Sequence, residues 1–75
     1  MAKNKEFRKL LKERGVKRKT LAERLGVSVR TVEHWLNGRN RPSMQYVIAM
    51  AKIFDMSIES MYAIFKEKEI ITVTK

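Results

Sequence analysis

The stretch that decides the fold is VKRKTLAERLGVSVRTVEHWLNGRNRPS, residues 16–43. It holds two short segments in which apolar residues recur at helical intervals of three and four. The residues on these apolar faces are Leu21, Ala22, Leu25, Val32, Trp35 and Leu36. Gly26-Val27-Ser28 separates the two segments. Two short helices joined by a tight turn of this kind form a helix-turn-helix motif.

The boundaries of these helices follow from their end residues. Thr20 followed by Glu23 has the form of a capping box, so a start at Thr20 is one of two choices that the sequence alone does not settle. A start at Lys17 is the competing choice, although cations are unfavourable at the positive end of a helix dipole. Ser28 is a good N-cap for the second helix. Gly38 suits the left-handed turn that would end it.

Outward from this stretch, helical spacing continues over residues 4–14, 43–54 and 57–65. Asn4, Ser43 and Ser57 are the expected N-caps of these segments, and Gly15 is the expected end of the first. The residues that we expect to face the core are Phe7, Leu10, Leu11, Met44, Val47, Met50, Ala51, Phe54, Ile58, Met61, Tyr62 and Phe65. The pattern predicts an all-α domain of five helices over residues 1–66. The tail, residues 67–75, is either a short β-strand or a frayed, disordered end.

Composition and charge limit the possible functions. With 75 residues the chain supports one small core, and the absence of cysteine fits a reducing cytosol. No apolar run approaches the roughly 20 residues that a membrane span needs. Residues 1–41 hold 13 Lys or Arg against four Glu, whereas residues 42–75 hold four Lys against four acids. This one-sided positive charge indicates a polyanionic partner such as nucleic acid, the alternative being charge for solubility.

The outer face of the second helix carries Val29, Arg30, Glu33 and His34. In a helix-turn-helix, side chains at these positions meet base edges in the major groove. Arg30 can bond guanine O6 and N7 or else contact phosphate, and Val29 can touch a thymine methyl or simply pack. Glu33 could accept a bond from cytosine N4, orient Arg30 or repel non-cognate DNA. His34 is a base contact, a phosphate contact or an exposed residue, and as the single histidine it has no partners for a metal site.

Residues that flank this face are suited to phosphate. Phosphate contacts set the register of a protein on DNA without reading sequence. The candidates are Lys17, Arg18, Lys19, Ser28, Asn37, Arg39, Asn40 and Arg41. The cations before the first helix of the motif would then receive a phosphate, whose negative charge offsets their cost at the helix start.

The stretch from Thr20 to Ser43 resembles the core of the phage repressor and Cro-like helix-turn-helix family, also called the xenobiotic-response-element family. The resemblance covers about Phe7 to Tyr62. It is carried by LAERLGVS, Thr31-Val32, Trp35, Asn37-Gly38 and Pro42-Ser43. It implies a lambda-repressor-like five-helix domain that binds double-stranded DNA, commonly as a homodimer on a palindromic operator. The implied setting is the cytoplasm of a prokaryotic cell, or a phage or mobile element.

Two departures from the family pattern matter. Lys17 and Arg18 stand where the family often has Thr-Gln, whose Gln holds a phosphate. Leu11 and Leu36 stand where many members bury an Arg–Glu ion pair. Replacing such a pair with packed apolar groups is often neutral or stabilising. We therefore predict that Leu11 and Leu36 touch each other.

The sequence favours a DNA-binding transcriptional regulator, and repression by blocking polymerase is expected because no effector module is visible. An enzyme is not expected, since no nucleophile is paired with a general base, and neither is a metal or cofactor. An antitoxin or adaptor that acts through a protein partner is the main alternative. RNA binding and membrane binding are weaker alternatives, because the aromatic and apolar faces look committed to a core. Surplus apolar residues predict a homodimer interface at Tyr46, Ala49, Ile53 and Ile64.

Overall fold

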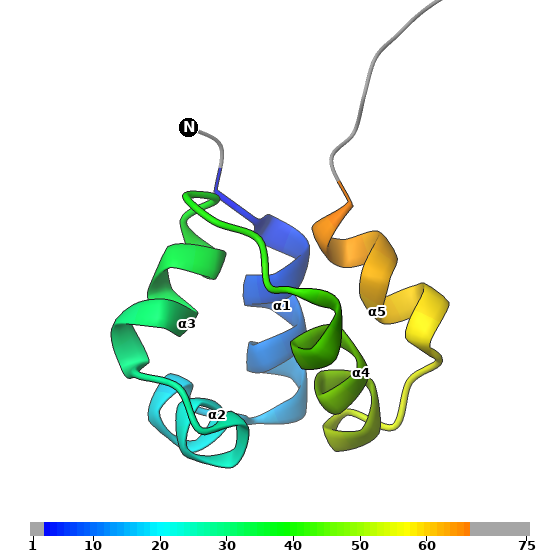
Figure 1. The fold of residues 1–75 in the computed structure, drawn as a ribbon, viewed down its shortest axis with the longest axis horizontal. Helices are drawn as coiled ribbons and strands as arrows, with labels where there is room; N and C mark the ends of the chain where they lie inside the picture. The colour runs from blue at the N-terminus through cyan, green and yellow to red at the C-terminus, as the bar shows by residue number, and fades with distance from the viewer. Residues whose placement is uncertain (1–2, 67–75) are drawn as a thin grey trace, which may run out of the picture.

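The computed structural model describes residues 3–66, which form five α-helices. The helices are α1 Lys5–Arg14, α2 Arg18–Leu25, α3 Val29–Leu36, α4 Met44–Ile53 and α5 Ile58–Phe65. In Figure 1, α1 runs through the middle of the molecule, with α2 and α3 on one side and α4 and α5 on the other. The predicted all-α, five-helix fold is confirmed for the described residues. The predicted strand or frayed end at residues 67–75 lies outside them.

Three of the four predicted N-caps bond their helix through the side chain, whereas Ser43 stands at the N-cap position of α4 without such a bond. The side chains of Asn4, Ser28 and Ser57 each accept a hydrogen bond from the backbone N–H three residues later. Such a bond satisfies one of the free N–H groups that every helix start exposes. Gly26 adopts φ 72°, a left-handed conformation that costs glycine little and other residues more. It ends α2 and turns the chain toward α3.

The core lies between α1 and the other four helices. Phe7 is fully buried, and its ring meets that of Phe65 edge-on with centroids 4.8 Å apart. The buried residues are Phe7, Leu10, Leu11, Leu21, Ala22, Val32, Trp35, Leu36, Val47, Met50, Ala51, Phe54, Met61 and Phe65. Leu11 and Leu36 are 6% and 1% exposed and line the same shallow hollow. The two residues are therefore near each other, as expected if they replace the buried Arg–Glu pair of related proteins. Their direct contact stays a prediction.

Three predicted core residues are instead exposed. Met44, Ile58 and Tyr62 are 47%, 43% and 45% exposed, so their assignment to the core was wrong. Met44 and Ile58 are the first residues of α4 and α5, at the rim of the core. Tyr62 follows Ile58 by one turn on the same face of α5, whereas the face that is buried carries Met61 and Phe65. The helix is apolar over more of its circumference than the core covers.

The predicted dimer residues lie between core and surface. Tyr46, Ala49, Ile53 and Ile64 are each half-buried. Tyr46, Ile53 and Ile64 pack against the core cluster. The ring of Tyr46 lies over that of the buried Trp35, with centroids 5.7 Å apart. These side chains therefore already contribute to the monomer.

Candidate nucleic-acid interface

The turn between α2 and α3 is held by three local hydrogen bonds. Gly26 N–H donates to the carbonyl of Glu23 at 3.3 Å, and Val27 N–H donates to the carbonyl of Ala22 at 3.0 Å. Ser28 Oγ accepts from Thr31 N–H at 3.1 Å. These bonds close α2 and open α3 within three residues. They hold the two helices in a fixed relationship, with their apolar faces on the shared core.

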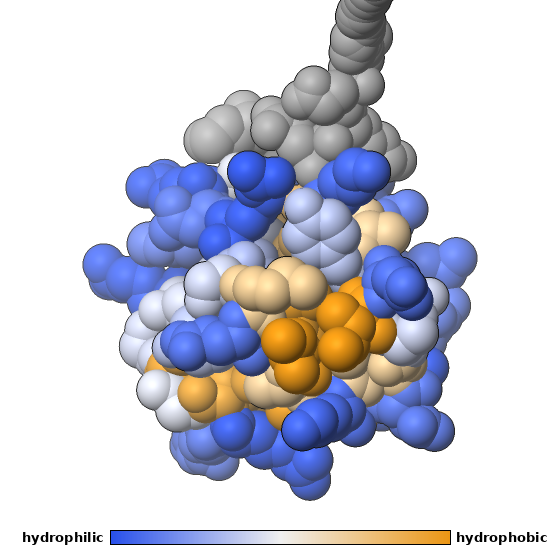
Figure 2. Space-filling view, turned by 45° about the vertical axis from the view of Figure 1, so that its right-hand side comes forward, coloured by the Kyte–Doolittle hydropathy of each residue, from blue (hydrophilic) through white to orange (hydrophobic). Residues whose placement is uncertain are grey.

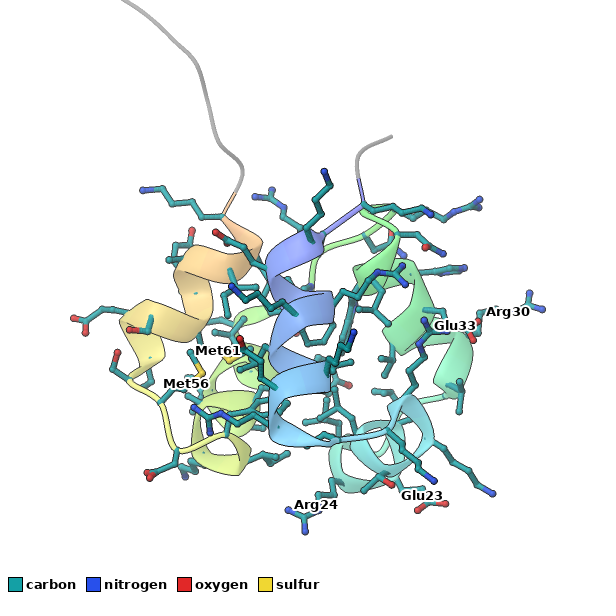
Figure 3. All side chains as sticks on the ribbon, turned by 180° about the vertical axis from the view of Figure 1, so that it is seen from behind. Glu23, Arg24, Arg30, Glu33, Met56 and Met61 are labelled. Carbon is teal, nitrogen blue, oxygen red and sulfur yellow. The ribbon has the colours of Figure 1, made fainter. Side chains whose placement is uncertain are left out.

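The predicted base-reading face of α3 points outward. Val29 is 37% exposed and Arg30 is exposed, while Glu33 and His34 are half-exposed. Figure 3 shows Arg30 extending from α3 away from the body of the protein. Arg30 and His34 lie on the side of α3 opposite the buried Val32, Trp35 and Leu36. Val29 and Glu33 lie between that side and the buried face. The structure thus brings the four candidates to one outer face, and their roles stay predictions.

The start of α2 is the one at Lys17, of the two that the sequence left open. The helix begins at Arg18 with Lys17 as its N-cap, and Leu21 N–H donates to the carbonyl of Lys17 at 3.0 Å. Thr20 therefore lies inside the first turn, and the alternative in which it is the N-cap is excluded. Within residues 3–66 no side chain caps this helix start. Its free N–H groups and the exposed cations Lys17, Arg18 and Lys19 face solvent together.

The second group of phosphate candidates follows α3. Asn37 is the C-cap, and Arg39 N–H donates to the carbonyl of His34 at 2.9 Å, which folds the loop back onto the helix end. Asn37, Arg39, Asn40 and Arg41 are all exposed. Cationic side chains therefore lie both at the start of α2 and just after α3. They precede and follow the turn and α3 along the chain, and Arg18 and Asn37 line one hollow together with Glu33.

Ser28 is a weaker phosphate candidate than its position suggested. Its hydroxyl lies 3.0 Å from Thr31 Oγ1 while it caps α3 through Thr31 N–H. Its backbone N–H and exposed position still allow a phosphate nearby. The observed role of Ser28 is to set the start of α3.

The structure adds an ion pair that sequence reasoning missed. Arg18 Nη1 lies 3.8 Å from Glu33 Oε2, and the two side chains are 46% and 45% exposed. The partner of Glu33 is therefore on α2. Among the described residues, Glu33 forms no ion pair with Arg30, so the structure does not support the alternative in which Glu33 orients Arg30. Local spacing gives no signal for this pairing, because it depends on how α2 packs against α3.

Two cations of α1 also join this region. Arg8 and Lys12 line a shallow hollow of about 340 Å³ together with Lys17 and Arg18. The floor of the hollow includes Leu11 and Leu36. The spacing of Arg8 and Lys12, four residues apart on one helix, was the available signal that they share a face. They extend the positive surface from α2 onto α1.

Comparison with known proteins agrees with this geometry. A family model described as helix-turn-helix matches residues 7–61, which is more than half of the chain. No match to this chain was found among curated proteins or among solved structures. In the part of the chain that the structure describes, no helix is long and apolar enough to cross a membrane.

Proposed function

Because the chain belongs to the Cro/C1-type helix-turn-helix family of DNA-binding transcription regulators, we propose that it is a sequence-specific repressor. In this proposal α3 enters the major groove of double-stranded DNA. The observation that carries it is the outward face of α3, together with the exposed cations at the start of α2 and in the loop after α3. The major groove admits one helix and displays a different donor and acceptor pattern for each base pair.

The proposal assigns base reading to the first turns of α3. Arg30 extends away from the body and would bond guanine O6 and N7 with both arms of its guanidinium group. Val29 would contact a thymine methyl group, since it is exposed at the helix start. Glu33 and His34 would reach bases from the second turn. These contacts would give the protein its sequence preference.

Phosphate binding is proposed for the two flanking groups. Lys17, Arg18 and Lys19 surround an uncapped helix start, so a phosphate there would meet free N–H groups, side-chain charge and the helix dipole together. Arg39, Asn40 and Arg41 would hold the second backbone segment, with Ser28 and Asn37 beside them. The salt slope is the steepness with which the logarithm of the binding constant falls with the logarithm of salt concentration. Each cation that neutralises a phosphate adds about 0.9 to this slope.

We propose that the protein acts as a homodimer through the side that carries α4 and α5. Figure 2 turns this side toward the viewer and shows apolar side chains gathered near its centre with charged side chains around them. Met44 and Tyr62 are almost half exposed and line a hollow of about 560 Å³ between α4 and α5. Tyr46, Ala49, Ile53 and Ile64 belong to the same two helices and are half-buried, so a second copy could cover them further. Two of them face other parts of the molecule, because Tyr46 lies against Trp35 and Ile53 lines a hollow that includes residues of α2.

The test is a binding selection from random duplex DNA at near-physiological salt, followed by sequencing. The expected result is two inverted half-sites whose centres are about one helical turn apart. Transcription in vitro from a promoter that overlaps the selected site then separates repression from activation. Binding that enriches no sequence and disappears as salt rises would contradict the proposal.

The same apolar hollow favours one alternative. An antitoxin or adaptor of this fold would act through a protein partner, and exposed apolar side chains such as Met44 and Tyr62 are suited to that. Such a protein does not need the flanking cations of α2 and of the loop after α3. This alternative would be favoured if substitution of Tyr62 abolished function while substitution of Arg30 had no effect.

A further inference from the structure

The ion pair between Arg18 and Glu33 lies at the centre of the proposed DNA interface. It connects the first residue of α2 with the middle of α3. Both residues line one hollow of about 250 Å³, together with Leu36 and Asn37. A phosphate approaching the start of α2 would therefore meet the carboxylate of Glu33 next to the guanidinium of Arg18.

The two proposed roles of this pair compete with each other. While Arg18 faces Glu33, part of its charge is neutralised, and the carboxylate repels a phosphate. While Glu33 faces Arg18, its carboxylate is not directed at a base. Cytosine N4 is a hydrogen-bond donor in the major groove, and a carboxylate can accept a hydrogen bond from it. Each residue can reach its DNA partner fully only when it leaves the other.

The geometry of the pair permits such an exchange. The 3.8 Å separation exceeds the roughly 2.7–2.9 Å of a charge-assisted hydrogen bond. Both side chains are about half exposed, and exposed ion pairs of this kind contribute little to stability. The free protein therefore keeps the pair, yet either residue is released at small cost when a stronger partner arrives.

We propose that Arg18 and Glu33 form a specificity switch, an inference that rests on the proposed function. On non-cognate DNA, Glu33 retains Arg18 and weakens phosphate binding at the start of α2. On the cognate operator, Glu33 accepts a hydrogen bond from cytosine N4, and Arg18 turns to the phosphate. Reading one base and gripping one phosphate thereby become a single coupled event. Glu33 is the specificity-determining residue, and Arg18 is the phosphate contact that it controls.

The first arm of the test uses random-sequence duplex DNA, so it needs no known operator. Fluorescence anisotropy titrations over a range of salt concentrations compare the wild type with Glu33→Gln, Arg18→Gln and the double variant. Glu33→Gln frees Arg18, so the affinity should rise severalfold and the salt slope should steepen by about 0.9. In the Arg18→Gln background the same substitution should give no such gain.

A matched control separates this effect from net charge. Glu13 on α1 forms an exposed pair with Lys9, with Nζ and Oε2 3.9 Å apart. Glu13→Gln removes the same charge from a pair of similar length that lies outside the hollow shared by Arg18 and Glu33. It should leave binding to random DNA nearly unchanged.

The second arm repeats the random-duplex selection with Glu33→Gln. Glutamine pairs with adenine N6 and N7, so one position of each half-site should change from cytosine to adenine. The ratio of operator to random-DNA affinity should fall by about tenfold, in line with the loss of one base contact. Arg18→Gln should keep the base preference but weaken operator binding, with a salt slope shallower by about 0.9.

The outcomes separate the switch from the proposed function. If the wild type enriches no sequence, the proposed function fails and the switch fails with it. If the wild type has an operator, but Glu33→Gln acts equally with and without Arg18 or no differently from Glu13→Gln, the switch alone is overturned. An unchanged base preference in Glu33→Gln would also overturn it.

Discussion

The side chain of Asn4 joins the beginning of the fold to its end, because Asn4 Nδ2 donates to the backbone carbonyl of Ile64 at 3.0 Å across 60 residues. The other side-chain atom, Oδ1, accepts from Phe7 N–H at 3.0 Å and so caps α1. The backbone N–H of Asn4 donates to the carbonyl of Leu36 at 2.9 Å, at the end of α3. One residue outside the helices thus connects α1, α3 and α5.

The two functions of the Asn4 side chain can be separated by substitution. Asn4→Ala removes both bonds and should lower the free energy of unfolding by about 2 kcal/mol. Asn4→Ser keeps a capping oxygen but cannot reach Ile64, so about half of that loss should remain. Urea denaturation followed by circular dichroism measures both. A serine variant as stable as the wild type would show that the bond to Ile64 contributes nothing.

The turn of the motif predicts a purely conformational cost at Gly26. Its φ is 72°, and a Cβ added there would meet no described atom within 4 Å. Gly26→Ala should therefore lower the free energy of unfolding by about 1 kcal/mol through backbone strain rather than through a clash. Gly26→Asn should lose less, since asparagine tolerates this conformation better. Equal losses for the two variants, measured by urea denaturation, would argue against this explanation.

The uncapped start of α2 predicts that stability and DNA binding oppose each other at Lys17. Lys17→Ser supplies the missing cap and should raise the free energy of unfolding by about 1 kcal/mol. Lys17→Ala removes the charge but provides no capping oxygen, so it should raise the free energy of unfolding by only about 0.3 kcal/mol. Both variants should bind DNA more weakly, with salt slopes shallower by about 0.9.

Comparison of these two variants at Lys17 tests the role of the cations directly. Thermal or urea denaturation reports stability, and anisotropy titrations report binding. A serine variant that gains stability and keeps full affinity would show that Lys17 does not contact phosphate. A serine variant no more stable than the alanine variant would show that the start of α2 gains nothing from a cap.

The sequence allowed the helices and most of the core to be predicted because local chemistry sets them. Asn4, Ser28 and Ser57 cap their helices as predicted, and Gly26 ends α2 in a left-handed conformation. The sequence left the start of α2 open between Thr20 and Lys17, because a local capping motif competes with the packing of a whole helix.

Exposure on α4 and α5 was harder to predict than helix position. Periodicity identifies apolar faces but not how wide a face a small core can cover. Met44 and Tyr62 fit the helical pattern, yet they lie at the rim. The Arg18–Glu33 pair was missed for a related reason, because its partners are 15 positions apart on helices whose relative placement only the structure gives.

The exposed side of α4 and α5 predicts where self-association can be disrupted without unfolding. Met44→Gln and Tyr62→Gln change side chains that are almost half exposed, so the free energy of unfolding of the monomer should change by less than about 0.5 kcal/mol. Dimerisation, measured by analytical ultracentrifugation, should weaken. Val29→Gln is the matched control, because Val29 is exposed and apolar but lies on α3. If Val29→Gln weakens dimerisation as much, the interface is not on α4 and α5.

The last prediction separates base reading from phosphate binding by comparing Arg30 with Arg39. Both are exposed arginines, one on the outer face of α3 and the other in the loop after it, so replacement by alanine removes the same charge. Arg30→Ala should weaken binding to the selected operator by about 1–3 kcal/mol and relax the preference at one guanine. Arg39→Ala should weaken operator and random duplex alike and make the salt slope shallower by about 0.9.

Anisotropy titrations on the operator, on single-base variants of it and on random duplex measure the operator affinity, the base preference and the salt slope. The contrast depends on geometry, because the two residues carry the same charge and differ in which part of DNA they can reach. If Arg30→Ala lowers affinity equally for every sequence, Arg30 contacts phosphate instead. The sequence preference would then have to come from the remaining residues of the face, of which Glu33 is the one held by a partner on α2.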